Sequence, residues 1–378
     1  MIIKKFKVNK KKKYEKIKNH EETRKYGLDL LKIIAMINII NLHINGFLSY
    51  TTIDIKSLKF KPIYRLEAFS YWPVDAFGLI SGIVGYKKYK FMNMIYLWFI
   101  AEFYSLFFSG ILYYQSKIGQ RDLFLSFFPL GLRRNWYVNG YIFMYYFLPF
   151  VTNSISSINK MLYGKIVFHF FFIYSIYYTI IKYNIQNAKA NFDQNFNYIG
   201  EGYSSFWLLI LFIIGGYIGK YFTYKNIILN IVYLLISLIS SLITSEYIFY
   251  SIRKYNVKNS IFLSYNSPTV ILQALSLALF FNTITINNKY LIKVISFLYP
   301  LNFSVNIIHT RFFFSKVQSS LELFKYIKSL TPENLFFKIY GVSIKIYFVC
   351  VFVDYIRSLI FKTFKIRTIC FYIEKLLF

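Results

Sequence analysis

Long apolar runs restrict what this chain of 378 residues can fold into more than any other feature. A membrane-spanning helix needs about 20 mostly apolar residues, and ten segments of the sequence meet that need. They cover residues 28–49, 68–86, 91–114, 135–154, 166–182, 203–222, 226–250, 266–284, 291–314 and 339–362. The runs are too long for membrane strands and do not alternate as such strands do. The sequence therefore predicts an all-α, polytopic bundle of about ten transmembrane helices in a lipid bilayer.

The composition agrees with a membrane protein and argues against nucleic-acid binding. Hydrophobic residues make up 56% of the chain and charged residues only 16%, whereas an ordinary soluble domain is about 25% charged. The net charge of +29 would suggest nucleic acid in a soluble chain, but no zinc-finger or RNA-binding signature accompanies it. Basic loops beside anionic lipid account better for the charge. We therefore expect no nucleic-acid partner.

The two ends of the chain predict its orientation. Residues 1–25 form a basic tail with eleven Lys or Arg, which the positive-inside rule places in the cytoplasm. Ten spans within residues 26–364 return the C-terminal tail, residues 365–378, to the same side. The first apolar run carries charges and lacks a small-residue cleavage site, so it is not a cleaved signal peptide. We expect an integral protein of a bacterial cytoplasmic membrane with both termini in the cytoplasm.

The connections between the runs are short and polar, so any chemistry must take place inside the bundle or at its rims. No internal repeat is visible, which argues against an inverted-repeat transporter. The two cysteines, Cys350 and Cys370, lack the spacing of metal ligands. We expect free thiols in an apolar setting and no metal site.

The first apolar run, in YGLDLLKIIAMINIINLHINGF, holds three ionisable residues: Asp29, Lys32 and His43. Such groups are costly in lipid and usually face a bundle interior. At about 100° per residue, Lys32 and His43 point within about 20° of each other, and Asp29 lies about 60° from Lys32. All three therefore share one helix face, with roughly 16 Å of axial rise between Lys32 and His43.

A basic group at the cytoplasmic rim and an imidazole beyond the midplane suit a long ligand with an anionic head and a reactive tail. Acyl-CoA has that shape, and imidazole is the usual general base for a hydroxyl near neutral pH. Spacing alone supports a second interpretation equally well. Lys32 would then extend to lipid headgroups, and His43 would bond a neighbouring helix.

Other polar positions are ambiguous in the same way. Ser81 and Gly82 suit close packing of small residues between helices. Trp136 and Tyr137 suit either a binding site or an aromatic belt at the membrane interface. A lone histidine such as His309 more often makes structural contacts in the packed interior than takes part in catalysis.

Taken in order, these motifs resemble those of the acyltransferase 3 family of integral membrane acyltransferases. The family's opening helix carries a basic residue, then ten further residues, then a histidine. The first apolar run resembles it, because Lys32 and His43 have this spacing. The segments that follow in the family's order are VDAFGLISGIVGYKK, NWYVNGYIFMYYFLPF, FWLLILFIIGGYIGKY, YNSPTVIL, PLNFSVNIIH and VDYIRSLIFK. The resemblance covers about residues 24–362. Within the family, the chain is most similar to stand-alone members, which lack a fused hydrolase-like domain.

The resemblance implies transfer of an acyl group, by default acetyl, from acyl-CoA as co-substrate to a hydroxyl of a cell-surface glycan or its lipid-linked precursor. No tightly bound cofactor is expected. The resemblance implies that His43 is essential, with Lys32 as its basic partner and Asp29 as the adjacent acid. Four further candidates for substrate or donor binding are Ser81, Trp136, Tyr137 and His309.

The sequence departs from the family pattern at several points. Lys32 stands where many members have Arg, Gly78 replaces a bulky residue, and Asn306 stands where Tyr is common. The basic residues of the run KKYKFMNM are all lysines, whereas many members of the family have an Arg-rich run at this point. The alternatives are a glycan transporter or flippase, a polysaccharide polymerase, and a non-catalytic protein with the same fold. A polymerase usually has paired arginines in a large extracytoplasmic loop. The pair Arg133–Arg134 resembles this feature only weakly, because the loop before it has only about 20 residues.

Overall fold

The computed structural model describes residues 24–51, 60–87, 89–130, 136–188, 199–222, 226–255, 261–310 and 330–377. These residues form helices, turns and loops, and none of them forms a strand. The N-terminal tail up to residue 23 and the pair Arg133–Arg134 lie outside them. For the described part, the prediction of an all-α chain is confirmed.

Six of the described helical segments are long and apolar enough to cross a membrane, which supports a membrane protein. They are Tyr26–Gly46, Phe91–Tyr114, Lys160–Asn184, Ile227–Lys254, Lys289–Ile308 and Pro332–Thr363. Two shorter apolar helices, Ser205–Tyr221 and Pro268–Thr283, accompany them.

The helices are, in chain order, α2 (Tyr26–Thr51), α3 (Phe60–Phe69), α4 (Pro73–Gly85), α5 (Phe91–Tyr114), α6 (Gln120–Leu125), α7 (Trp136–Ser157), α8 (Lys160–Phe171), a π-helical segment (Phe172–Tyr177), α9 (Tyr178–Ala188), α10 (Ser205–Tyr221), α11 (Ile227–Tyr255), α12 (Pro268–Thr283), α13 (Lys289–Leu298), α14 (Asn302–Ile308), α17 (Pro332–Thr363) and α18 (Ile366–Leu377). Each of the ten predicted runs overlaps these helices. Two runs are interrupted at prolines, which lack the N–H that a helix interior needs. The helix is interrupted between Phe69, where α3 ends, and Pro73, where α4 begins, and a 3₁₀ turn containing Pro300 separates α13 from α14.

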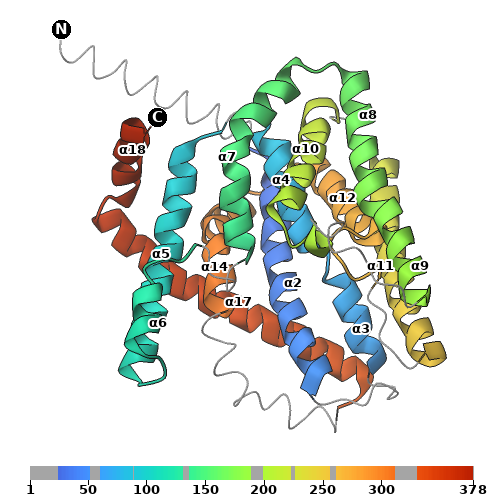
Figure 1. Cartoon of the computed structure of the whole chain (residues 1–378), viewed down its shortest axis with the longest axis horizontal. Helices are drawn as coiled ribbons and strands as arrows, with labels where there is room; N and C mark the ends of the chain where they lie inside the picture. Colours follow the sequence, from blue (N-terminus) through green and yellow to red (C-terminus); the bar gives the residue numbers. More distant parts are fainter. Residues whose placement is uncertain are drawn as a thin grey trace.

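The centre of the bundle holds α2, α4, α10 and α12, with α17 running along one side of α2 (Figure 1). Glycines allow α4 and α10 to approach closely. A Cβ on Gly82 would lie 2.1 Å from the carbonyl oxygen of Phe212, and one on Gly78 would lie 2.8 Å from Cβ of Leu211. Only glycine fits at this contact. Close helix packing therefore explains Gly78, where the family pattern has a bulky residue.

A buried polar network joins α17 to α5. Asp354 and Arg357 form an ion pair with Nε–Oδ1 at 2.8 Å, and both side chains are buried. Tyr104 of α5 donates its hydroxyl hydrogen to Asp354 at 2.7 Å, and Arg357 donates to the hydroxyl of Tyr96 at 3.2 Å. Because a buried charge is costly without its partner, this network holds the two helices in one register.

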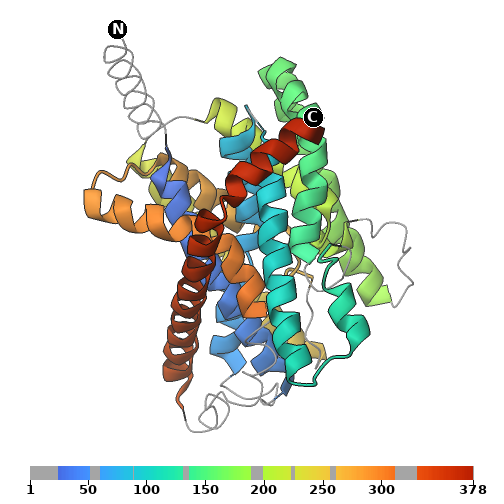
Figure 2. The same ribbon diagram turned by 90° about the vertical axis from the view of Figure 1, so that its left-hand side faces the viewer.

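The last helix, α18, follows α17 and packs back on the first turns of α5 (Figure 2). The segment 365–378 was predicted as a tail. Its described part begins with Lys365 in the left-handed region at φ +50° and continues as this helix to Leu377. Glu374 accepts a hydrogen bond from the backbone N–H of Met92 at 3.0 Å. Both cysteines are buried and form no disulfide, and burial raises the pKa of the Cys370 thiol.

Candidate functional site

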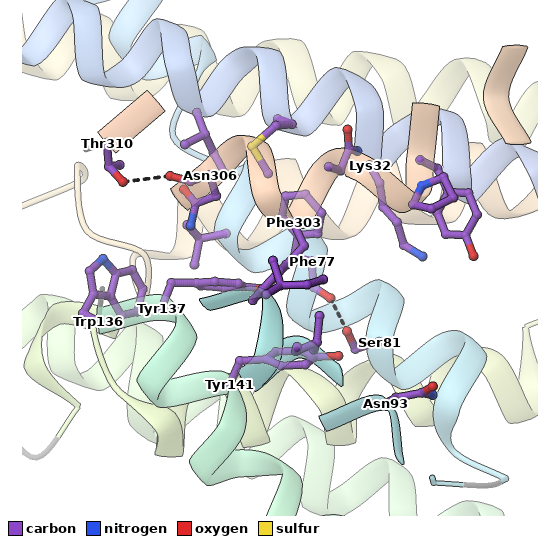
Figure 3. A pocket seen from close by; sticks show the side chains of 18 of the residues that line it. Lys32, Phe77, Ser81, Asn93, Trp136, Tyr137, Tyr141, Phe303, Asn306 and Thr310 are labelled. Carbon is purple, nitrogen blue, oxygen red and sulfur yellow. Dashed lines mark hydrogen bonds between the residues drawn. The ribbon is translucent and has the colours of Figure 1, made fainter. Parts of the chain in front are cut away.

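A cavity of about 500 Å³ lies inside the bundle, lined by residues of α2, α4, α5, α7, α14 and α18. This volume is within the range of small-molecule sites, about 300–1,000 Å³. The cavity is elongated: Lys32 lies at one end, Trp136 and Thr310 lie at the other, and Ser81 and Tyr141 lie between them (Figure 3). An extended ligand would therefore fit along it.

Helix α2 supplies residues at both ends of this cavity. Lys32 and His43 of α2 both line it, in line with the shared helix face derived from their spacing. Asp29 does not line the cavity but lies beside Lys32, with Oδ1 at 3.3 Å from Nζ, and its Oδ2 accepts from Nε of Arg24 at 2.8 Å. Asp29 therefore positions two cations at the start of the helix.

Positive charge gathers at the Lys32 end. The Arg24 guanidinium lies 4.4 Å from the ring centre of Tyr299, and the Lys32 ammonium lies 5.4 Å from the same ring. Arg367 of α18 also lines the cavity and stacks on Tyr96, with its guanidinium carbon 4.8 Å from the ring centre. Such cation–π contacts hold a cation in place without neutralising it. This end of the cavity is suited to an anionic group.

At the other end, His43 is hydrogen-bonded to His309. Nδ1 of His43 lies 2.8 Å from Nε2 of His309, and Nδ1 of His309 lies 2.7 Å from the backbone carbonyl oxygen of Val305. The two rings are stacked, with centres 5.0 Å apart. His309 is 2% exposed and does not line the cavity, so it contacts the site only through His43.

This chain of bonds determines the tautomers of both histidines in their neutral form. A carbonyl oxygen can only accept, so His309 carries its hydrogen on Nδ1 and its lone pair on Nε2. That lone pair accepts the Nδ1 hydrogen of His43, which leaves the lone pair of His43 on Nε2. A neutral imidazole held in this way can take a proton from a hydroxyl group.

The remaining sequence candidates take different places. Ser81 lines the middle of the cavity and donates its hydroxyl hydrogen to the carbonyl oxygen of Phe77 at 2.8 Å. Trp136 and Tyr137 line the cavity from α7, so they face the bundle interior. His309 is the partner of His43. The structure thus brings candidates from four separate segments to one cavity, either in its lining or directly behind a lining residue.

Sequence reasoning missed several lining residues, above all Arg367 and Asn302. Arg367 lies in residues 365–378, which the sequence analysis predicted as a tail, although apolar residues at helical spacing in residues 366–377 indicate a helix packed on the bundle. Asn302 is buried, lines the cavity, and accepts a hydrogen bond from the Tyr347 hydroxyl at 2.7 Å. Its Nδ2 has no hydrogen-bond partner among the described residues. A ligand in the cavity could accept a hydrogen bond there.

Comparison with protein families, with curated proteins and with solved structures finds no match to this chain. Its function must therefore be inferred from the site itself. In the described part of the chain, no three His, Cys, Asp or Glu side chains lie close enough together to hold a metal ion.

Proposed function

We propose that this chain is a membrane-embedded acyltransferase, similar to the acyltransferase 3 family, that moves an acyl group from acyl-CoA to a hydroxyl of a glycan or lipid-linked glycan. One observation supports this most directly. A single cavity joins fixed cations at the Lys32 end to a neutral imidazole base, His43, at the other. The acyl group is acetyl by default, and no tightly bound cofactor is needed.

In this proposal acyl-CoA lies along the length of the cavity. Acyl-CoA carries its phosphates at one end of an extended arm and its thioester at the other. Lys32 and Arg367 would bind the phosphates, since charge-assisted hydrogen bonds to phosphate are among the stronger ones. The unused Nδ2 hydrogen of Asn302 would donate to an amide carbonyl of the arm. The roughly 16 Å rise from Lys32 to His43 then separates the two ends of the donor.

The chemical step follows from the tautomer of His43. Nε2 takes the proton of the acceptor hydroxyl while the oxygen attacks the thioester carbonyl carbon and forms the new ester bond. The carbon–sulfur bond breaks, and the departing CoA thiolate takes the proton from His43. His309 accepts the Nδ1 hydrogen of His43 throughout, so His309 is a positioning residue. Asp29 positions the cations Arg24 and Lys32 at the other end of the cavity.

The proposed topology has ten spans, the six long helices together with α4, α7, α10 and α12. The thirteen residues of α4 rise only about 20 Å, but this helix is surrounded by α2, α10 and α12. Backbone that is buried in protein need not reach across the lipid. Both termini and the Lys32 end then face the cytoplasm of a bacterial cell, where acyl-CoA is available.

The test uses membranes containing the full chain, incubated with labelled acetyl-CoA. His43→Ala should lower the transfer of label to glycan by about 10²–10⁴-fold. His169→Ala is the matched control, because His169 is exposed on α8 and bonds only the carbonyl of Lys165 in its own helix. Equal activity of the two variants would contradict the role of His43. Absence of label from glycan and lipid with the unaltered protein would instead favour a transporter, a polymerase or a non-catalytic protein.

A further inference from the structure

Four aromatic side chains from four segments meet at the end of the cavity away from Lys32. The ring of Trp136 lies 4.8 Å from that of Tyr203 and 5.9 Å from that of Tyr265, measured between centres. Tyr265 also lies 4.7 Å from Tyr203 and 5.0 Å from Tyr71. We call these four residues the aromatic cluster. Trp136 and Tyr265 line the cavity, and the other two support them.

The backbone around Gly202 holds this cluster in place. Gly202 has φ +93°, and a Cβ there would lie 2.4 Å from Cβ of Tyr265, so only glycine permits the contact. The N–H of Tyr265 donates to the carbonyl of Glu201 at 3.1 Å, and the carboxylate of Glu201 pairs with Lys182. Tyr265 is 4% exposed. The ring of Tyr265 is therefore held in place before any ligand arrives.

The cluster lies at the same end as the histidine pair. Thr310 and Trp136 both lie at that end of the cavity (Figure 3). Thr310 follows His309, which bonds His43. A molecule stacked on Trp136 would therefore hold its outer groups near Nε2 of His43.

We infer that the aromatic cluster is the acceptor subsite and that it binds a pyranose ring of the glycan by stacking. This inference rests on the proposed function. The faces of a pyranose carry C–H groups with a slight positive charge, and aromatic faces carry a negative one. The hydroxyls of a pyranose project from its rim, so a ring stacked on Trp136 presents them sideways, toward His43. An acyclic polyol has no such face.

An aromatic belt at the membrane surface is the structural alternative. Belt residues turn their rings to lipid headgroups, whereas Tyr265 is buried and lines the cavity together with Trp136. The two interpretations also differ in what substitution does, because a belt residue has no effect on glycan affinity.

The experiment measures glycan binding directly in full-length protein carrying His43→Ala, so that no transfer occurs. The probe is the native glycan fraction, freed of ester-linked acyl groups by mild alkali, titrated by calorimetry. Trp136→Leu should raise the Kd for this glycan about 2- to 13-fold, since an aromatic contact of this kind is worth about 0.5–1.5 kcal/mol. Trp136→Phe should raise it about twofold at most. Trp98→Leu, which changes a tryptophan of α5 outside the cavity lining, should leave it unchanged.

Equal Kd values for Trp136→Leu and Trp98→Leu, at matched thermal stability, would overturn the subsite, and so would equally tight binding of polyglycerol. Other results would contradict the proposed function without contradicting the subsite, or the reverse. Glycan binding that depends on Trp136, without label transfer by the unaltered protein, would retain the subsite and reject the acyltransferase. Transfer with an acceptor KM that does not change in Trp136→Leu would reject the subsite alone.

Discussion

Replacing His309 with alanine is expected to slow acyl transfer without weakening the binding of acyl-CoA. The change removes the nitrogen that accepts the Nδ1 hydrogen of His43 at 2.8 Å. His43 then loses the partner that sets its tautomer and ring orientation. His309 is buried and does not line the cavity, so the substitution does not remove a contact to the donor.

The expected size of the effect follows from that hydrogen bond. Leaving a buried donor without its acceptor costs about 1–3 kcal/mol, which corresponds to about 5- to 150-fold in rate. This loss should appear in kcat and be smaller than that caused by His43→Ala. The KM for acyl-CoA should stay the same, because Lys32, at the proposed phosphate end, lies roughly 16 Å along α2 from His43.

The assay compares kcat and KM for labelled acetyl-CoA in membranes with equal amounts of folded protein. His309→Gln serves as the rescue variant, since its side-chain oxygen can accept the hydrogen of His43 in place of Nε2. Its kcat should lie between those of the unaltered protein and His309→Ala. If His309→Ala retains full kcat while His43→Ala abolishes transfer, then His309 does not position the base. A changed donor KM with unchanged kcat would also contradict the reasoning.

Three further variants test other parts of the structure. Asp354→Asn leaves Arg357 buried without its charge partner, at a cost of about 3–5 kcal/mol, and should lower the Tm in detergent; an unchanged Tm would reject the network as a stabilising element. Gly82→Ala places a methyl group 2.1 Å from a backbone carbonyl of α10 and should cost about 1–3 kcal/mol, whereas Gly110→Ala, with open space around it, should leave the Tm unchanged. Arg367→Gln should raise the KM for acyl-CoA about 13- to 160-fold, because a hydrogen bond to a charged group is worth about 1.5–3 kcal/mol, and the increase should shrink at high salt; a donor KM that changes neither with the substitution nor with salt would mean that the phosphates bind elsewhere.

Local sequence patterns determined the helices and the shared face of α2. A run of about 20 apolar residues has few stable forms in lipid, because every backbone N–H and C=O must be paired within the segment. The helical period then places Lys32 and His43 on one side of α2 whatever packs against it. These features depend on neighbours in the chain, so they can be read from the residues in order.

Only the tertiary structure decided which partners meet these residues. His309 lies 266 positions from His43, and nothing in the spacing along the chain brings them together. Arg367 enters the cavity because α18 folds back on α5, and the aromatic cluster forms because Gly202 lets its loop touch Tyr265. Which helices pack side by side depends on side-chain shape across many contacts. For this reason the sequence indicated a candidate base on one helix, and the fold supplied the residues that are proposed to orient this base, bind the donor and receive the acceptor.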